Sequence, residues 1–275
     1  MAFPSHLIVD SLPASRKSEA PVPTGKSQSQ ALFFRMLPAE LRTRIYELCL
    51  GDLKNYTRIL HIKPRQFTYT RCYEEDVFTS SKLWVREPRR LTSLLKTCKL
   101  IYHEAARVLY AQNRFFLSFD MKVRDRKLVT FLDTLPSTTV AWIRHLHIYP
   151  SFVSQRRLGA RVYPSDRLEE WKACCAAIEA MSSLQELKVT AQIPAGIWNP
   201  PNGDSWFIDV FRPLMGVEVQ DFEVRLAFEF PHSAVETLGG SLPFRVTVDE
   251  SVQNPQVKEA ESKYPAARDY SFAAN

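Results

Sequence analysis

Residues 142–149, WIRHLHIY, alternate between polar and apolar side chains from His145 to Tyr149. This period of two is typical of a β-strand with one buried and one polar face. Similar stretches occur at residues 115–119, 184–191, 222–228 and 244–248. The segments between the strands are long enough for crossover helices, so the sequence predicts an α/β fold with a mostly parallel sheet.

Four segments with helical spacing lie between these strands. Apolar residues recur three and four positions apart around Phe131, Trp171 and Phe211, and residues 232–238 fit a shorter helix. Asp166 and Glu169 are spaced as a capping box at the start of the second helix. The pattern therefore predicts one helix after each strand from residue 115 to residue 238.

Strand alternation also predicts how the helices cover the sheet. A parallel sheet covered on both faces has nearly continuous apolar strands, whereas these strands alternate. We therefore expect a single layer of helices behind a curved sheet, with the other face exposed to water. That polar face would contain His145, His147, Tyr149, Glu186, Lys188, Thr190, Glu223, Arg225, Arg245 and Thr247.

Two helices are expected before the sheet. Pro38 suits a first helical position and Gly51 a C-terminal cap, so a short amphipathic helix should lie between them. Its apolar side contains Leu41, Ile45, Leu48 and Cys49. Thr92 or Ser93 can cap a second helix, which Asn113 should stop. The apolar side of this second helix contains Leu94, Leu95, Cys98, Ile101, Tyr102, Ala105 and Leu109.

Residues 51–91 separate these two helices. Residues 57–62 and 66–73 favour strands and flank Pro64 and Arg65, which predicts a hairpin. Basic and aromatic side chains interleave there: Lys63, Arg65, Phe67, Tyr69 and Arg71. The hairpin is therefore one candidate surface for nucleic acid, with cations for phosphates and rings for bases.

The two N-terminal helices, with the run through Tyr110, Asn113, Phe115 and Phe119, resemble the F-box-like domain of a large fungal family. The resemblance covers about residues 32–120. It implies docking on the Skp adaptor of a cullin–RING ubiquitin ligase through Leu37, Pro38, Leu41, Ile45, Leu94 and Leu95.

Residues 121–250 are similar to an irregular leucine-rich-repeat array, and the closest match is Leu184, Leu187 and Val189. F-box proteins often use such arrays as substrate receptors. This resemblance implies that the polar sheet face binds a substrate protein, through His145, His147, Tyr149, Glu186, Lys188, Arg225 and Arg245. An ordinary solvated face is the alternative.

Composition limits the functional classes. The formal charge of +6 is uneven: residues 35–130 contain 20 Lys and Arg against 10 Asp and Glu, and residues 131–275 contain 13 against 18. Five cysteines, an odd number, favour a reduced cytoplasmic or nuclear protein. No apolar run is long enough for a membrane span. Residues 1–31 and 251–275 are expected to be flexible tails.

Enzyme signatures are weak in this sequence. It contains no Gly-x-Ser-x-Gly, His-Glu-x-x-His or Cys-x-x-Cys pattern. His145, His147 and Glu186 are the residues on which a zinc site would have to be built. We therefore expect a non-catalytic interaction adaptor that needs no cofactor or metal. The alternatives are a basic nucleic-acid-binding protein and a scaffold that has lost Skp binding.

Overall fold

The structure is a computed structural model of the chain. It describes residue 29 and residues 31–63, 66–72, 94–120, 127–152, 165–193 and 203–249. The predicted tails, apart from residues 29 and 31, lie outside the described residues. So does most of the segment that precedes the second predicted helix, residues 73–93.

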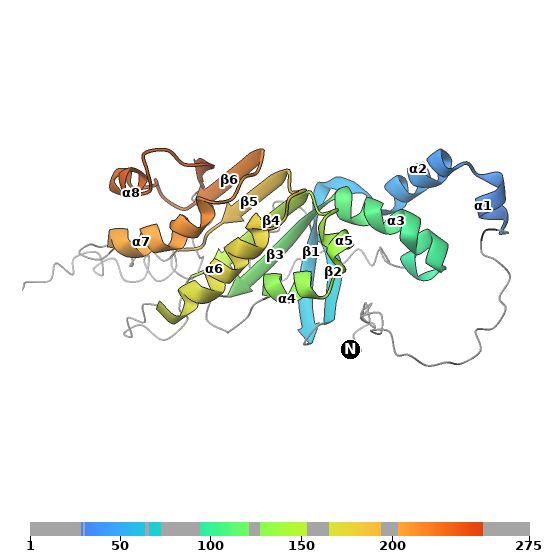
Figure 1. The fold of residues 1–275 in the computed structure, drawn as a ribbon, viewed down its shortest axis with the longest axis horizontal. Helices are drawn as coiled ribbons and strands as arrows, with labels where there is room; N and C mark the ends of the chain where they lie inside the picture. The colour runs from blue at the N-terminus through green and yellow to red at the C-terminus, as the bar shows by residue number, and fades with distance from the viewer. Residues whose placement is uncertain are drawn as a thin grey trace, which may run out of the picture.

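The fold is mixed α/β and contains an open sheet of seven strands in the order β2-β1-β3-β4-β5-β6-β7 (Figure 1). Neighbouring strands run parallel except β1 and β2, which form an antiparallel pair. The five predicted strands and the hairpin are confirmed. The strands are β1 (Asp52–Lys63), β2 (Gln66–Cys72), β3 (Asn113–Asp120), β4 (His145–Ser151), β5 (Glu186–Thr190), β6 (Asp221–Leu226) and β7 (Arg245–Val248).

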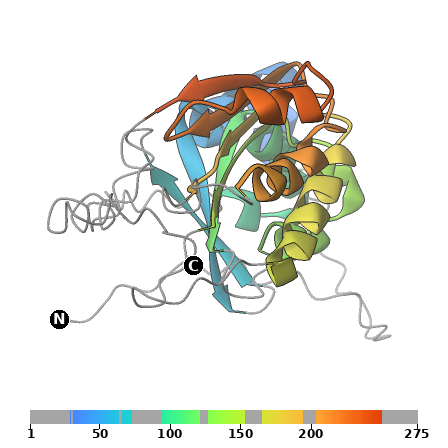
Figure 2. The ribbon, with the colours of Figure 1, turned by 90° about the vertical axis from the view of Figure 1, so that its left-hand side faces the viewer.

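The predicted crossover helices are also present. They are α4 (Lys127–Asp133), the short α5 (Ser137–Val140), α6 (Ser165–Glu179), α7 (Gly203–Phe211) with the 3-10 turn η5 (Arg212–Leu214), and α8 (His232–Thr237). Figure 2 shows α4, α6 and α7 on the same side of the sheet. The indole N–H of Trp171 in α6 donates to the carbonyl of Val210 in α7 at 2.6 Å, which links neighbouring helices of this layer.

The core lies between this helical layer and the sheet. Leu146, Ile148, Leu187, Val189 and Val224 are buried, as strand alternation predicted. Trp171, Phe131 and Phe211 pack against them from the helices. Val248 was expected in the same series, but it lies at the end of the edge strand β7 and is exposed.

The hairpin is built into the sheet. Its first strand, β1, pairs with β2 on one side and in parallel with β3 on the other. The single sheet therefore contains strands from both the F-box-like region, residues 32–120, and the repeat-like region, residues 121–250. No helix among the described residues is both long and apolar enough to span a membrane.

The N-terminal helices gather at the end of the molecule where β1 and β2 lie (Figure 1). They are α1 (Leu32–Met36), α2 (Ala39–Leu50), the 3-10 turn η3 (Leu94–Lys96) and α3 (Lys99–Ala111). Gly51 ends α2 as predicted, in a site where an added Cβ would lie 2.8 Å from the carbonyl oxygen of Glu47. Close approach of the backbone therefore explains this glycine.

The start of one of these helices differs from the prediction, and the sequence did not specify which side of α2 is buried. The second helix begins at Lys99, because the Cys98 side chain caps it by accepting from the Ile101 N–H. The buried side of α2 is formed by Tyr46 and Leu50, whereas Leu41, Leu48 and Cys49 are exposed. Helical spacing therefore located the apolar stripe that contains Leu41 and Leu48. A different side of α2, with Tyr46 and Leu50, packs on the core.

Candidate functional site

Exposed apolar side chains are concentrated on α1 and α2. The α1–α2 apolar surface is defined here by Leu32, Met36, Leu41 and Leu48, whose exposed fractions range from 53% to 73%. In the described part of the chain, Val248 is the one other large apolar residue with comparable exposure. Four such residues lie within residues 32–48, whereas exposed apolar residues are usually scattered singly along a chain, so this segment is a candidate interaction site.

Within each helix, the exposed apolar residues lie on one side. Leu41 and Leu48 are seven residues apart, so they project from the same side of α2. Ile45 lies between them on that side and is partly buried. Leu32 and Met36 are four residues apart in α1, and that helix has no buried residue. Each helix thus presents an apolar stripe that does not contribute to the core.

A polar cluster fixes α2 on α3 from the opposite side. The guanidinium of Arg42 donates to both carboxylate oxygens of Glu104, at 2.8 and 2.9 Å, and Tyr46 donates its hydroxyl to Glu104 at 2.9 Å. Arg42 also donates to the Leu37 carbonyl at 2.6 Å and lies over the Phe34 ring. The hydrogen bond from Arg42 holds the pKa of Glu104 below its usual range.

Asn113 connects the C-terminal ends of the same two helices. Its fully buried amide N–H groups donate to the carbonyls of Leu50 in α2, at 2.9 Å, and Leu109 in α3, at 2.7 Å. The last carbonyls of a helix have no partner within the helix, so Asn113 satisfies one at each end. Helix α2, which carries Leu41 and Leu48, is therefore held on α3 near both of its ends.

The structure places the predicted adaptor-binding residues in two different environments. Leu37 and Pro38 connect α1 to α2, and Leu41 and Ile45 follow within α2. Leu94 and Leu95 lie in η3, are partly buried, and pack against the core. Leu41 thus belongs to the α1–α2 apolar surface and Leu37, Pro38 and Ile45 lie near it in the chain, whereas the two leucines of η3 pack against the core.

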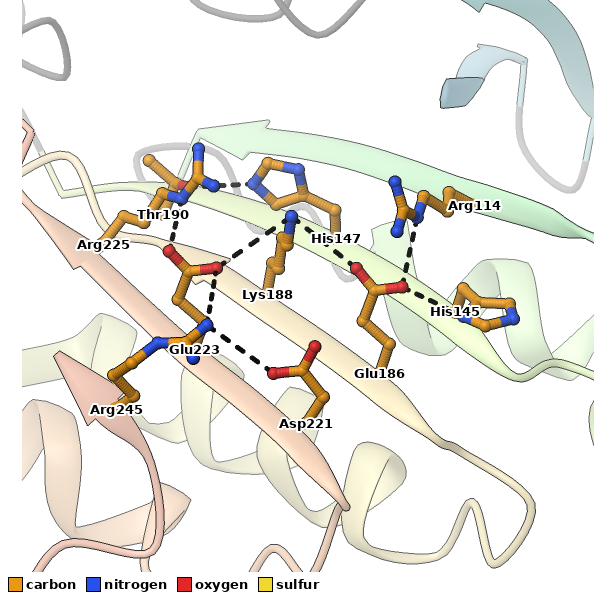
Figure 3. Close-up of polar contacts among 10 residues, drawn as sticks. All are labelled: Arg114, His145, His147, Glu186, Lys188, Thr190, Asp221, Glu223, Arg225 and Arg245. Carbon is orange, nitrogen blue, oxygen red and sulfur yellow. Dashed lines mark hydrogen bonds and ion pairs between the residues drawn. The ribbon is translucent and has the colours of Figure 1, made fainter. Parts of the chain in front are cut away.

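The second candidate surface is the sheet face opposite the helices (Figure 3). Register places its residues in rows across the strands. One row is Arg114, His145, Glu186 and Asp221; the next is Phe116, His147, Lys188, Glu223 and Arg245. The expectation that these residues share one face is confirmed. Arg114 was missed because its strand was predicted to begin at residue 115.

Glu186 is the centre of one ion cluster on this face. Its carboxylate lies 3.1 Å from Arg114 Nε, 3.1 Å from His145 Nδ1 and 3.6 Å from Lys188 Nζ. The hydrogen bond with His145, with the charges of Arg114 and Lys188, lowers the pKa of Glu186 to about 2 despite its burial. Glu186 is therefore ionised at neutral pH.

Glu223 is the centre of a second cluster. Its carboxylate lies 2.8 Å from Arg225 Nε, 4.0 Å from Lys188 Nζ and 3.7 Å from Arg245 Nη2. Burial alone would raise the pKa of Glu223, but the hydrogen bond and charge of Arg225 hold it below its usual range. Lys188 contacts both carboxylates and so joins the two clusters.

His147 lies beneath these charges. Its ring packs 5.1 Å from the rings of Tyr56 and Phe116, and its Nε2 lies 2.8 Å from Thr190 Oγ1. Burial, followed by the charges of Lys188 and Arg225, lowers the pKa of His147 to about 3. The imidazole is thus neutral at physiological pH.

These contacts correct the expectation of a fully wet sheet face. His147, Glu186, Thr190 and Glu223 are buried, and burial raises the pKa of Tyr149 to about 12. The charged side chains cover one another because their ion-pair partners lie on the same strand or on a neighbouring strand. Arg245, on the edge strand β7, is the exposed member of the predicted set.

Other candidate sites have less support in the described residues. No group of three or more His, Cys, Asp or Glu side chains in the described ranges is arranged to hold a metal ion. In the hairpin, the Tyr69 hydroxyl lies 3.2 Å from that of Tyr110, and the Tyr69 ring packs against the core. Arg65 and the side chains of Lys63, Phe67 and Arg71 lie outside the described part.

The fold and these surfaces define a mixed α/β protein with an open, mostly parallel sheet and helices that expose an apolar surface at one end. The chain belongs to the family described as Domain of unknown function (DUF7730), which matches residues 26–246. No curated protein and no solved structure shows a match to the chain.

Proposed function

We propose that this protein is a non-catalytic interaction adaptor that binds a partner protein through the α1–α2 apolar surface. The observation that carries this proposal is the concentration of exposed large apolar side chains on two helices, one of which is fixed by buried polar contacts. Burying a leucine side chain stabilises a complex by about 1.5–3 kcal/mol, so this surface offers substantial binding energy.

The F-box resemblance supports a Skp-type adaptor of a cullin–RING ubiquitin ligase as the partner. Leu37, Pro38, Leu41 and Ile45 lie in or next to the helix that carries the exposed stripe. Such an assembly would operate in the cytoplasm or nucleus. The chain also departs from the F-box pattern: a two-stranded hairpin of the sheet separates its two helices, and Ile101 and Tyr102 occupy the neighbourhood of the usual Trp.

The sheet face is the proposed surface for a substrate protein. The consecutive order of the parallel strands from β3 to β7 supports the likeness to a leucine-rich-repeat array. In this arrangement, the helical end would contact the ligase scaffold and the polar face would present the substrate.

Co-expression of the full chain with the Skp-type adaptor from the same organism tests this proposal. Size-exclusion chromatography with mass detection should yield a stable one-to-one complex. A folded chain that elutes alone would contradict the ligase proposal and favour the alternative of a scaffold without Skp binding.

A further inference from the structure

The edge strand β7 directs backbone hydrogen-bonding groups away from the sheet. It pairs in parallel with β6 and, among the described strands, has no neighbour on its other side. The Asp249 N–H donates to the Leu226 carbonyl, and the register pairs Leu226 with Val248. In a parallel ladder, this pattern turns the N–H and C=O groups of Asp249, and of every second residue before it, toward β6. The backbone groups of Val246 and Val248 therefore point outward.

The same strand exposes an apolar side chain. Val248 lies on the side of the sheet that the helices cover, since its register partner Leu226 is buried in the core, yet Val248 is 48% exposed. The register of β7 with β6 is continuous and the strand contains no proline, so β7 lacks two common protections of an edge strand, a bulge and a proline. The strand is therefore competent to pair with a further strand.

The sequence around β7 is self-complementary for antiparallel pairing. It reads Arg245, Val246, Thr247, Val248 and Asp249. When two copies pair about a two-fold axis at Thr247, Val246 of each copy lies opposite Val248 of the other. These are the residues whose backbone groups point outward, so each opposed pair can exchange both of its N–H···O bonds. One register therefore satisfies the outward groups of both strands.

Side chains also match in this register, because residues directly opposite each other project from the same face. On the side of the helices, the exposed Val248 meets Val246 of the second copy. On the other side, Arg245 lies opposite Asp249 of the second copy, and opposite charges at facing positions are stabilising. The Arg245 side chain is 67% exposed, and its Nη2 lies 3.7 Å from two carboxylates of its own chain, beyond hydrogen-bond distance.

We propose that β7 pairs with β7 of a second copy of this chain, in antiparallel orientation centred on Thr247, and so joins two sheets into one. This inference goes beyond the proposed function. The strand order places β7 at the opposite end of the sheet from β1 and β2, where the N-terminal helices lie (Figure 1). The contact therefore leaves the α1–α2 apolar surface of each copy away from the interface.

Sedimentation velocity of the full chain tests this inference. The strand β7 has four residues, and a contact of this size is at the small end of protein interfaces. We therefore expect a dimer that dissociates on dilution, with a dissociation constant on the order of 10 μM. The sedimenting mass should rise above that of the 31.7 kDa monomer between about 1 and about 100 μM protein. A folded wild type that stays monomeric over this range would overturn the inference.

Val248→Pro removes an outward N–H that β6 does not use, so the fold should tolerate it. Association of this variant should weaken at least about tenfold. The matched control Val248→Ile keeps the N–H and an apolar side chain and should associate like the wild type. So should Leu41→Asp/Leu48→Asp, which alters the α1–α2 apolar surface. Unchanged association of Val248→Pro, or loss of association in the double variant, would overturn the inference.

Disulfide cross-linking tests the register and does not depend on the proline variant. Two opposed copies of Thr247 form a non-hydrogen-bonded pair with Cα atoms about 4.5 Å apart, within the range of a disulfide. In a Cys49→Ser background, which removes an exposed thiol, Thr247→Cys should form a covalent dimer with oxidised glutathione.

Arg245→Cys in the same background is the matched control for cross-linking. The two copies of residue 245 lie roughly 14 Å apart along the paired strands, too far for a disulfide. Non-reducing gel electrophoresis measures both variants, and circular dichroism should show that each is folded. Equal cross-linking of the two variants, or none of Thr247→Cys, would overturn the inference.

Discussion

Arg42 and Glu104 form an ion pair at 2.8 Å although 62 residues separate them in the chain. The pair fixes α2 on α3 on the side opposite the exposed Leu41 and Leu48. Tyr46 donates to the same carboxylate, so one acidic side chain orients two residues of α2. The apolar surface therefore belongs to a helix whose orientation is set by specific polar contacts.

Replacement of Glu104 tests this role. Glu104→Ala should lower the free energy of unfolding by about 2 kcal/mol, because the partly buried Arg42 and the buried Tyr46 lose their shared acceptor. Glu40→Ala, which removes an exposed carboxylate from α2, is the matched control and should have little effect. Urea unfolding measures both. An equal effect of the two substitutions would show that the cluster does not hold α2.

The two sides of α2 should respond differently to substitution. Leu41→Asp and Leu48→Asp should each change the free energy of unfolding by no more than about 0.5 kcal/mol, because both side chains are exposed. Leu50→Ala, at a site that is 1% exposed, should cost about 2–5 kcal/mol. Thermal unfolding distinguishes these outcomes, and strong destabilisation by either aspartate would contradict the assigned orientation of α2.

Asn113 should be one of the most sensitive polar positions. Asn113→Ala leaves the carbonyls of Leu50 and Leu109 without their donor and should cost about 2–3 kcal/mol. Asn113→Asp should cost more, because it places an acceptor where the two carbonyls need a donor. Urea unfolding at neutral pH measures both variants, and a tolerated aspartate would refute the donor role.

The lowered pKa of the buried His147 predicts that acid destabilises the fold. Its pKa is about 3 in the folded protein, below the usual 6.5. An unfolded chain takes up a proton near pH 6.5, whereas the folded chain does so only near pH 3. The contribution of His147 to the free energy of unfolding is therefore fully present above about pH 6.5. It falls between about pH 6.5 and pH 3, by up to about 1.4 kcal/mol per pH unit.

His147→Gln should flatten this dependence, since an amide does not titrate. Urea unfolding at several pH values between 7 and 4 gives the slope for each protein. His103→Gln, at an exposed site on α3, is the control and should retain the wild-type slope. The same slope in wild type and His147→Gln would argue against a buried neutral imidazole.

The local patterns of the sequence predicted most of the fold. Alternation in the stretch from His145 to Tyr149 located β4 and assigned its two faces, because a strand has a side-chain period of two. Apolar spacing around Trp171 located α6 in the same way. Such patterns depend on neighbours a few residues apart, which are visible in a single sequence.

The features that were missed depend on distant partners. The pairs between Arg42 and Glu104 and between Arg114 and Glu186 join residues 62 and 72 positions apart. No local pattern indicates such pairing. For the same reason, helical spacing revealed an apolar stripe on α2 but not that Tyr46, on another side, would be the buried residue.

The α1–α2 apolar surface is the proposed binding surface for the adaptor. Isothermal titration of the Skp-type adaptor into the purified full chain tests it most directly, with Leu41→Asp/Leu48→Asp and the control Val248→Asp in parallel. Wild type and Val248→Asp should bind with one-to-one stoichiometry, and the double variant should bind at least about 100-fold more weakly. Equal binding by the double variant, or no binding by the folded wild type, would contradict the claim.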